Sequence, residues 1–186
     1  MKKHKIYSTY IKVLADTITP VGAYLKMRDH YPNALLLESS DYHSKEDSFS
    51  FICLNPIAGF EAKEKKAAIL NIEGSTEYFE VATMREMAKA FKSFLSQFEE
   101  VAQQSPIPIC GLFGYTSFDA VQYFEDIQFK TKKTSNKDNP DMKYQLFKYV
   151  LAIDHFKKSI KNRSSKGIRF GVLESSGCTG YTYSMD

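Results

Sequence analysis

Tryptophan is absent from this sequence, and the aromatic residues, 14% of the chain, are all tyrosine or phenylalanine. That content favours a folded core that contains β-structure. Cysteine is scarce: Cys53, Cys110 and Cys178 lie far apart, without the Cys-x-x-Cys or mixed His and Cys spacing of a zinc site. An odd number of widely spaced cysteines also gives no disulfide framework. The sequence therefore predicts neither structural zinc nor disulfide bonds, as in a reducing compartment.

Long apolar runs and a strong excess of one charge are also missing. No segment approaches the ~20 apolar residues of a membrane-spanning helix, and the charged start "MKKHKIYSTYIKVL" lacks the apolar stretch of a signal peptide. The net charge is only +3 and the lysines are scattered, which argues against nucleic acid or a membrane as partner. With 43% hydrophobic residues the 186-residue chain lies well outside the disordered class. We expect a soluble cytoplasmic protein.

Two helices are marked by their start signals. Thr19 followed by Pro20 predicts an N-cap and a first helical turn, with the helix continuing to about His30. Val21, Tyr24, Leu25 and Arg28 would then share one face of this helix.

The second helix begins at a capping box. Thr83 and Glu86 have the spacing at which each side chain satisfies a backbone N–H of the other. Apolar residues then recur at steps of three and four: Met84, Met87, Ala88, Phe91, Phe94, Leu95 and Phe98. This stripe is typical of a core face, and a groove for a partner is the alternative.

The remaining pattern is mainly that of short strands. Apolar runs predict strands at Leu35–Leu37 and Phe49–Leu54. Further strands are expected at 10–19, 67–72, 77–81, 109–115 and 144–156, a short helix at 117–125, and a solvated loop at 129–142. Gly111 and Gly114 form a Gly-x-x-Gly within a strand, which indicates close packing or a bulge and not a phosphate loop. The fold class is predicted to be α+β, with a largely antiparallel sheet and a few packed helices.

One strand ends in an unusual way. "ALLLESSD" leads from three leucines directly into Glu38 and Ser39, whereas strands usually leave a core through turn-forming residues. A carboxylate buried there without a partner would cost several kcal/mol, so Glu38 is either exposed or placed to meet a cation. A carboxylate beside a hydroxyl suits a ligand ammonium group. The residues alone leave both possibilities open.

Several motifs together resemble a known family. "TPVGAYLKMRD", "ALLLESSD", "SFSFICLNP", "GLFGYTSFDAVQYFE" and "VLAIDHFKKSI" occur between residues 19 and 160 in the order seen in the amino-terminal region of anthranilate synthase component I. The resemblance covers most of this chain but well under half of the family's usual length. It implies a lyase that makes anthranilate from chorismate, with ammonia from a glutamine amidotransferase subunit, in tryptophan biosynthesis.

The resemblance also implies a role for the Leu-Leu-Glu-Ser segment. In the family this segment forms part of the site for tryptophan, the feedback inhibitor, so Glu38 and Ser39 are the expected tryptophan-binding residues. The chorismate centre and its Mg²⁺ site belong to the carboxy-terminal catalytic domain, which is missing here. No catalytic or metal-binding residue is therefore expected in this chain, and the chain alone is predicted to be inactive.

Some positions depart from the family pattern. Arginines common in the family are replaced by Ser48 or Asp47 and by Gln122. Residues 1–160 are therefore predicted to be a divergent regulatory region, and residues 161–186 a poorly specified tail. The amino-terminal region of aminodeoxychorismate synthase component I and a stand-alone amino-acid-binding module remain alternatives.

Overall fold

The computed structural model describes residues 3–14, 18–38, 49–102, 110–127, 129, 139–154 and 167–175, with the side chains of 12–14, 102 and 167–175 left undescribed. The elements are β1 (His4–Leu14), α1 (Pro20–Met27), β2 (Leu35–Leu37), β3 (Phe49–Lys63), β4 (Lys66–Leu70), β5 (Thr76–Glu80), α2 (Met84–Leu95), β6 (Phe98–Ala102), β7 (Leu112–Thr116), the 3₁₀ helix η1 (Phe118–Tyr123), β8 (Met142–Asp154) and β9 (Gly167–Ser175).

The strands form one sheet in the order β5-β4-β3-β8-β9-β1-β6, with β2 paired to β3 and β7 to β8. Every pairing is antiparallel except that of β1 with β6. The predicted α+β class with a largely antiparallel sheet is therefore confirmed.

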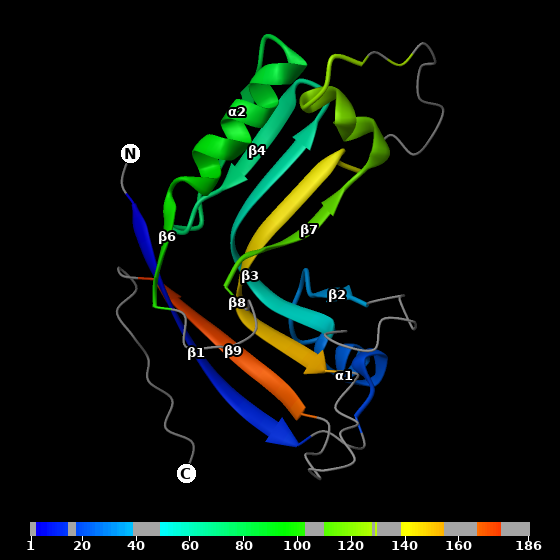
Figure 1. Cartoon of the computed structure of the whole chain (residues 1–186), viewed down its shortest axis with the longest axis vertical. Helices are drawn as coiled ribbons and strands as arrows, with labels where there is room; N and C mark the ends of the chain where they lie inside the picture. The colour runs from blue at the N-terminus through cyan, green and yellow to red at the C-terminus, as the bar shows by residue number, and fades with distance from the viewer. Residues whose placement is uncertain are drawn as a thin grey trace.

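Two long strands organise the sheet. β3 and β8 pair along almost their whole length, and both curve strongly (Figure 1). On its outer side, β3 pairs first with β2 and then with β4, while β8 pairs first with β7 and then with β9. We call the part with β4, β5 and β7 the α2 half, and the part with β2 and β9 the α1 half, after the helix that packs on each.

A bulge allows β3 to pass from one half to the other. The predicted end of this strand at Leu54 is wrong, because the strand continues through Pro56 to Lys63. Asn55 has φ 57°, and the register with β8 shifts between Pro56 and Ala58. A bulge tolerates a proline, which has no N–H for the ladder, and it bends the strand locally.

The larger core lies in the α2 half. Met87 and Phe94 of α2 are buried there against Phe60 of β3, and the ring centroids of Phe60 and Phe94 lie 5.8 Å apart. The predicted apolar stripe is confirmed for these residues. Leu95, in contrast, is 42% exposed, so its predicted place in the core is wrong.

The smaller core lies under α1. Thr19 caps this helix as predicted, since its Oγ1 accepts a hydrogen bond from the Gly22 N–H at 3.1 Å. Of the residues predicted to share one face, Val21 and Leu25 are 44% and 47% exposed, whereas the residue of this helix that is buried is Ala23. The small Ala23 side chain lets the helix approach the strands closely, and this fixes which face turns inward.

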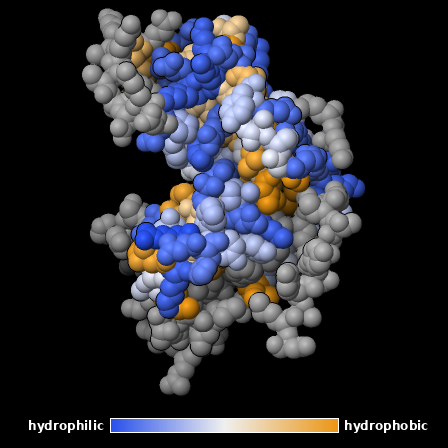
Figure 2. Space-filling model, turned by 180° about the vertical axis from the view of Figure 1, so that it is seen from behind, coloured by the Kyte–Doolittle hydropathy of each residue, from blue (hydrophilic) through white to orange (hydrophobic). Residues whose placement is uncertain are grey.

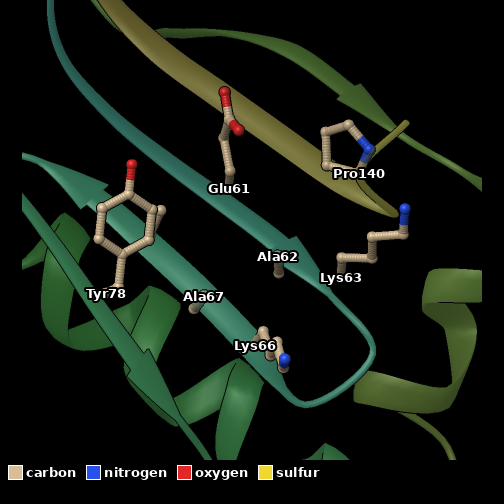
Figure 3. Close-up of a pocket in the computed structure, with 8 residues that line it drawn as sticks. Glu61, Ala62, Lys63, Lys66, Ala67, Tyr78 and Pro140 are labelled. Carbon is tan, nitrogen blue, oxygen red and sulfur yellow. The ribbon is translucent and has the colours of Figure 1, made fainter. Parts of the chain in front are cut away.

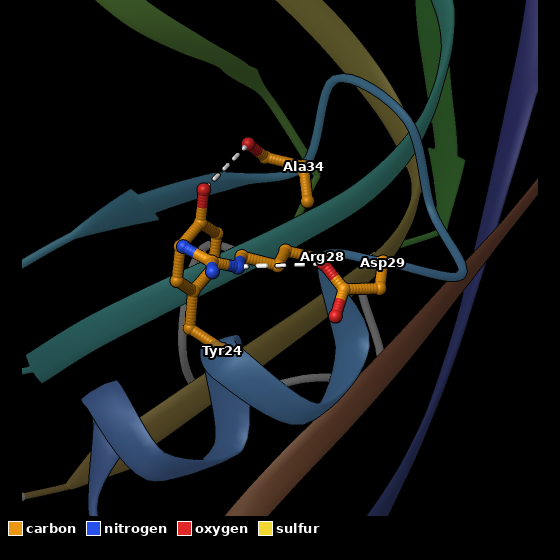
Figure 4. Close-up of polar contacts among 4 residues, drawn as sticks. All are labelled: Tyr24, Arg28, Asp29 and Ala34. Atoms are coloured by element: carbon orange, nitrogen blue, oxygen red, sulfur yellow. Dashed lines mark hydrogen bonds and ion pairs between the residues drawn. The ribbon is translucent and has the colours of Figure 1, made fainter.

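Polar contacts hold the chain that leaves α1. The Tyr24 hydroxyl donates to the Ala34 carbonyl at 3.4 Å, whereas the ion pair of Arg28 with Asp29 is exposed (Figure 4). The helix ends at Met27, earlier than the predicted His30. α1 is therefore connected to the start of β2 through Tyr24, one of the residues predicted to share a face of this helix.

Strand β9 comes from the segment that the sequence predicts to be a poorly specified tail. Its residues 167–175 pair with β8 on one side and with β1 on the other. The division of the chain at residue 160 stays a prediction. Among the described residues, no helix is long and apolar enough to cross a bilayer.

Candidate functional site

The strand that carries the predicted binding residues is short and lies beside β3. Leu37, the last residue of β2, is opposite Phe51 of β3. Glu38 follows directly and is exposed, so its carboxylate is not buried without a partner. Ser39 lies outside the described residues. The structure thus places one of the two predicted site residues.

The leucines before Glu38 hold β2 through two separate clusters. Leu36 packs with Ile52 and Leu54 in the core under α1. Leu35 packs in a second cluster with Cys53 and Val150. Because successive side chains of a strand point to opposite faces, apolar contacts on both faces fix β2, and with it the backbone position of Glu38.

Aromatic rings lie alongside the end of this strand. Phe51, the partner of Leu37, has its ring centroid 5.4 Å from that of Phe113 on β7 and 6.2 Å from that of Phe49. All three rings are partly exposed. An exposed carboxylate that follows a strand paired with one of these rings suits a ligand with an ammonium group and an apolar body.

The buried thiol of this region is not a nucleophile. Cys53 is fully buried, and burial raises its pKa from 9.0 to about 12. Since the thiolate is the reactive form, Cys53 acts as an apolar core residue at neutral pH. Thiol chemistry is therefore excluded at this position.

The described residues do not fit the Mg²⁺ site that the family resemblance implies for the intact enzyme. Across those residues, no group of three or more His, Cys, Asp or Glu side chains could hold a metal ion. Mg²⁺ in enzyme sites is held by carboxylates together with substrate oxygens. No step through a metal is derived for this part of the chain.

A shallow hollow lies in the other half of the sheet. It measures about 200 Å³ and is lined by Glu61, Lys66 and Tyr78, among others (Figure 3). Its charges are largely matched, because Glu61 pairs with Lys143 and Lys66 pairs with Glu80. The hollow shares no residue with the end of β2, and it has no set of catalytic groups.

A buried polar pair was missed by the sequence analysis. Asp141 lies in the predicted solvated loop, yet it is only 4% exposed, so that prediction is wrong for this residue. Its Oδ2 accepts hydrogen bonds from the Tyr123 hydroxyl at 2.8 Å and from the Glu64 N–H at 2.9 Å. Burial and the bond to Asp141 raise the pKa of Tyr123. The pair joins η1 to the β3–β4 turn and has no part in the β2 site.

Comparisons with known proteins confirm the family resemblance. No protein-family model matches the chain. Anthranilate synthase component 1 of Lactococcus lactis is 27% identical over 150 residues, which are 80% of this chain and 30% of that protein. The proteins of the same name from Acinetobacter calcoaceticus and Aquifex aeolicus are 28% and 24% identical over 81% and 82% of this chain. The chain spans about 30% of the curated relatives that it matches.

Proposed function

We propose that this chain is the regulatory region of an anthranilate synthase component I. The observation that carries the proposal is its similarity, over about four-fifths of its length, to relatives that bear this name. The intact protein would convert chorismate and ammonia to anthranilate. Its catalytic region and a glutamine amidotransferase subunit would supply the chemistry and the ammonia.

The site proposed for this chain binds the amino group of tryptophan. Glu38 would accept charge-assisted hydrogen bonds from the ligand ammonium, and the Ser39 hydroxyl would add a further bond. Two features of the β2 region support this assignment. Leucine side chains on both faces fix the strand before Glu38, and the rings of Phe51 and Phe113 offer an apolar surface nearby.

The test requires an enzyme that contains this region. In a chimera, the whole 186-residue chain replaces the 150 matched residues of the Lactococcus lactis protein. We expect this chimera to form anthranilate from chorismate, ammonia and magnesium, and tryptophan to inhibit it. Formation of aminodeoxychorismate in place of anthranilate would contradict the proposal.

Ser39→Ala should weaken inhibition without affecting catalysis. A hydrogen bond to a charged group is worth about 1.5–3 kcal/mol, so the inhibitory tryptophan concentration should rise roughly ten- to hundredfold. Inhibition curves at equal chorismate concentration measure the change.

The matched controls lie in the β4–β5 turn. Ser75→Ala removes the same hydroxyl from an exposed position and should leave inhibition unchanged. Likewise, Glu38→Gln should weaken inhibition while Glu73→Gln should not. Superimposable curves for the wild-type and Ser39→Ala chimeras would refute the assignment of the binding site.

A further inference from the structure

One segment of the chain exposes an unusual amount of apolar surface. We call this the η1 surface; its members are Tyr115, Phe118, Phe124, Ile127 and Phe129. Phe118 is 80% exposed and Phe124 is 50% exposed. Hydrophobic residues also form small patches between hydrophilic ones on the rear face of the molecule (Figure 2), but isolated exposed apolar residues need no special explanation. The η1 surface gathers five such residues between positions 115 and 129, and the rings of two of them, Phe118 and Phe129, are in contact.

Buried residues of the same 3₁₀ helix hold the η1 surface in place. Ala120 and Tyr123, within the same 3₁₀ helix, are buried in the core of the α2 half. The Tyr123 hydroxyl is further fixed by its hydrogen bond to Asp141. Above them, the rings of Phe118 and Phe129 lie against each other with centroids 5.5 Å apart. The rings are thus anchored before any partner arrives, which reduces the entropy lost on binding.

Acidic residues alternate in the sequence with the members of the η1 surface, and we call these acidic residues its rim. Residues 115–129 contain Asp119, Glu125 and Asp126 and no lysine or arginine, in a chain whose net charge is +3. Asp126 contacts Arg85 of α2 at 3.0 Å, and this ion pair is exposed. An apolar centre with an acidic rim is complementary to a partner that presents apolar side chains among basic ones.

We propose that the η1 surface docks the catalytic region of the intact protein, through an apolar patch with a basic rim. The inference rests on the proposed function. This chain spans 30% of the Lactococcus lactis relative, so the larger part of that protein has no counterpart here and is available as the occupant. A second copy of this chain is a poorer occupant, because two acidic rims would repel each other.

The chimera described above tests the inference by side-chain labelling. Hydroxyl-radical labelling of Phe118 and Phe124 should be severalfold slower in the chimera than in the free 186-residue chain. Tyr78 of β5 is the matched control, since it is 82% exposed and lies outside the η1 surface. Its labelling rate should be the same in both proteins. Equal rates for Phe118 in the two proteins would overturn the inference, as would failure of the chimera to fold while the free chain folds.

A variant gives a second, independent readout. Phe118→Asp should lower the melting midpoint of the chimera by roughly 5 °C, because it places a charge in a buried apolar contact. It should lower the midpoint of the free chain by much less, because there only the exposed contact with Phe129 is lost, and Tyr78→Asp should change neither protein. Loss of a dimer of the free chain on Phe118→Asp would identify a second copy as the occupant and overturn the proposal.

The two proposals fail in different ways. A chimera that protects Phe118 but forms no anthranilate would retain the docking surface and reject the proposed function. A chimera that forms anthranilate but leaves Phe118 as reactive as in the free chain would retain the function and reject the docking surface.

Discussion

Gly111 and Gly114 belong to the same Gly-x-x-Gly pattern but occupy different environments. A Cβ added to Gly114 would lie 1.9 Å from the Lys143 carbonyl oxygen, whereas a Cβ on Gly111 would meet no atom within 4 Å. Gly114 pairs with Tyr144 in the β7–β8 ladder, so the clash would fall on backbone that cannot move independently. The pattern correctly indicated close packing in this strand, but only the structure shows which glycine needs it.

We expect Gly114→Ala to destabilise the chain by about 3 kcal/mol, because the added methyl group forces β7 away from β8. Gly111→Ala should change the free energy of unfolding by no more than about 0.5 kcal/mol. Urea unfolding of the two variants measures the difference, and equal effects would contradict the close approach at Gly114.

Because of the buried Cys53 thiol, we expect the free energy of unfolding to fall at alkaline pH. Its pKa is raised from 9.0 to about 12 by burial, so the folded thiol stays neutral while the unfolded thiol ionises. The contribution of this group is complete below pH 9 and falls as the pH rises from there toward 12. The loss approaches about 1.4 kcal/mol per pH unit.

Cys53→Ala should remove this contribution to the pH dependence and leave a constant difference in the free energy of unfolding, caused by the smaller side chain. Urea unfolding at several pH values measures the slope, and parallel curves for the two proteins would contradict it.

At the scale of elements, the two predicted helix caps behave differently. Thr19 makes its capping bond to Gly22. Thr83 makes no side-chain bond at the start of α2, and instead Glu86 accepts from the Ala82 N–H at 2.9 Å. The predicted capping box is thus wrong for the hydroxyl, while the carboxylate does bond backbone at the start of the helix.

This difference predicts unequal effects of the same substitution. Thr19→Ala should cost about 1 kcal/mol, the typical worth of an N-cap. Thr83→Ala should cost no more than a few tenths of a kcal/mol, because no bond is lost. Thermal unfolding of both variants compares them, and a larger loss for Thr83→Ala would contradict the observed bonding.

The local sequence pattern predicted most of the helices and strands, but not how these elements pack and pair with one another. The periodicity of α2 indicated its core face, since Met87 and Phe94 follow the helical repeat. The inner face of α1 depends on strands distant in sequence, and its apolar residues are too evenly spread for periodicity to select Ala23. The continuation of β3 past Pro56 was missed for a similar reason. A bulge depends on the pairing partner, which the sequence of β3 does not specify.

For the molecule as a whole, the sequence predicted the strand before Glu38 better than the surroundings of that strand. The end of β2 at Glu38 could be located from the apolar run. The neighbouring rings could not, because Phe113 and Phe51 lie on different strands, β7 and β3, far apart in the sequence. The place of β9 could not be predicted either, since the segment that contains it, rich in serine, glycine and threonine, has no clean period.

We expect the purified 186-residue chain to form no anthranilate from chorismate, ammonia and magnesium. The described residues provide no cluster of metal ligands, and the proposed catalytic region is absent. Fluorescence of anthranilate measures the product, with the chimera as the positive control. Turnover by the chain alone would contradict this prediction.

The position of β9 has a consequence for how the protein is made. β1 is made before the other described strands, but among the described residues β1 and its parallel partner β6 join the rest of the sheet through β9. The ladder between β1 and β9 runs from Ile6 opposite Ser175 to Leu14 opposite Gly167. A nascent chain that ends before residue 167 can pair β3 with β4 and β8, yet it leaves β1 and β8 with open edges. Such edges recruit other strands, so we expect chaperones to be needed most after β8 has been made and before residues 167–175 have followed.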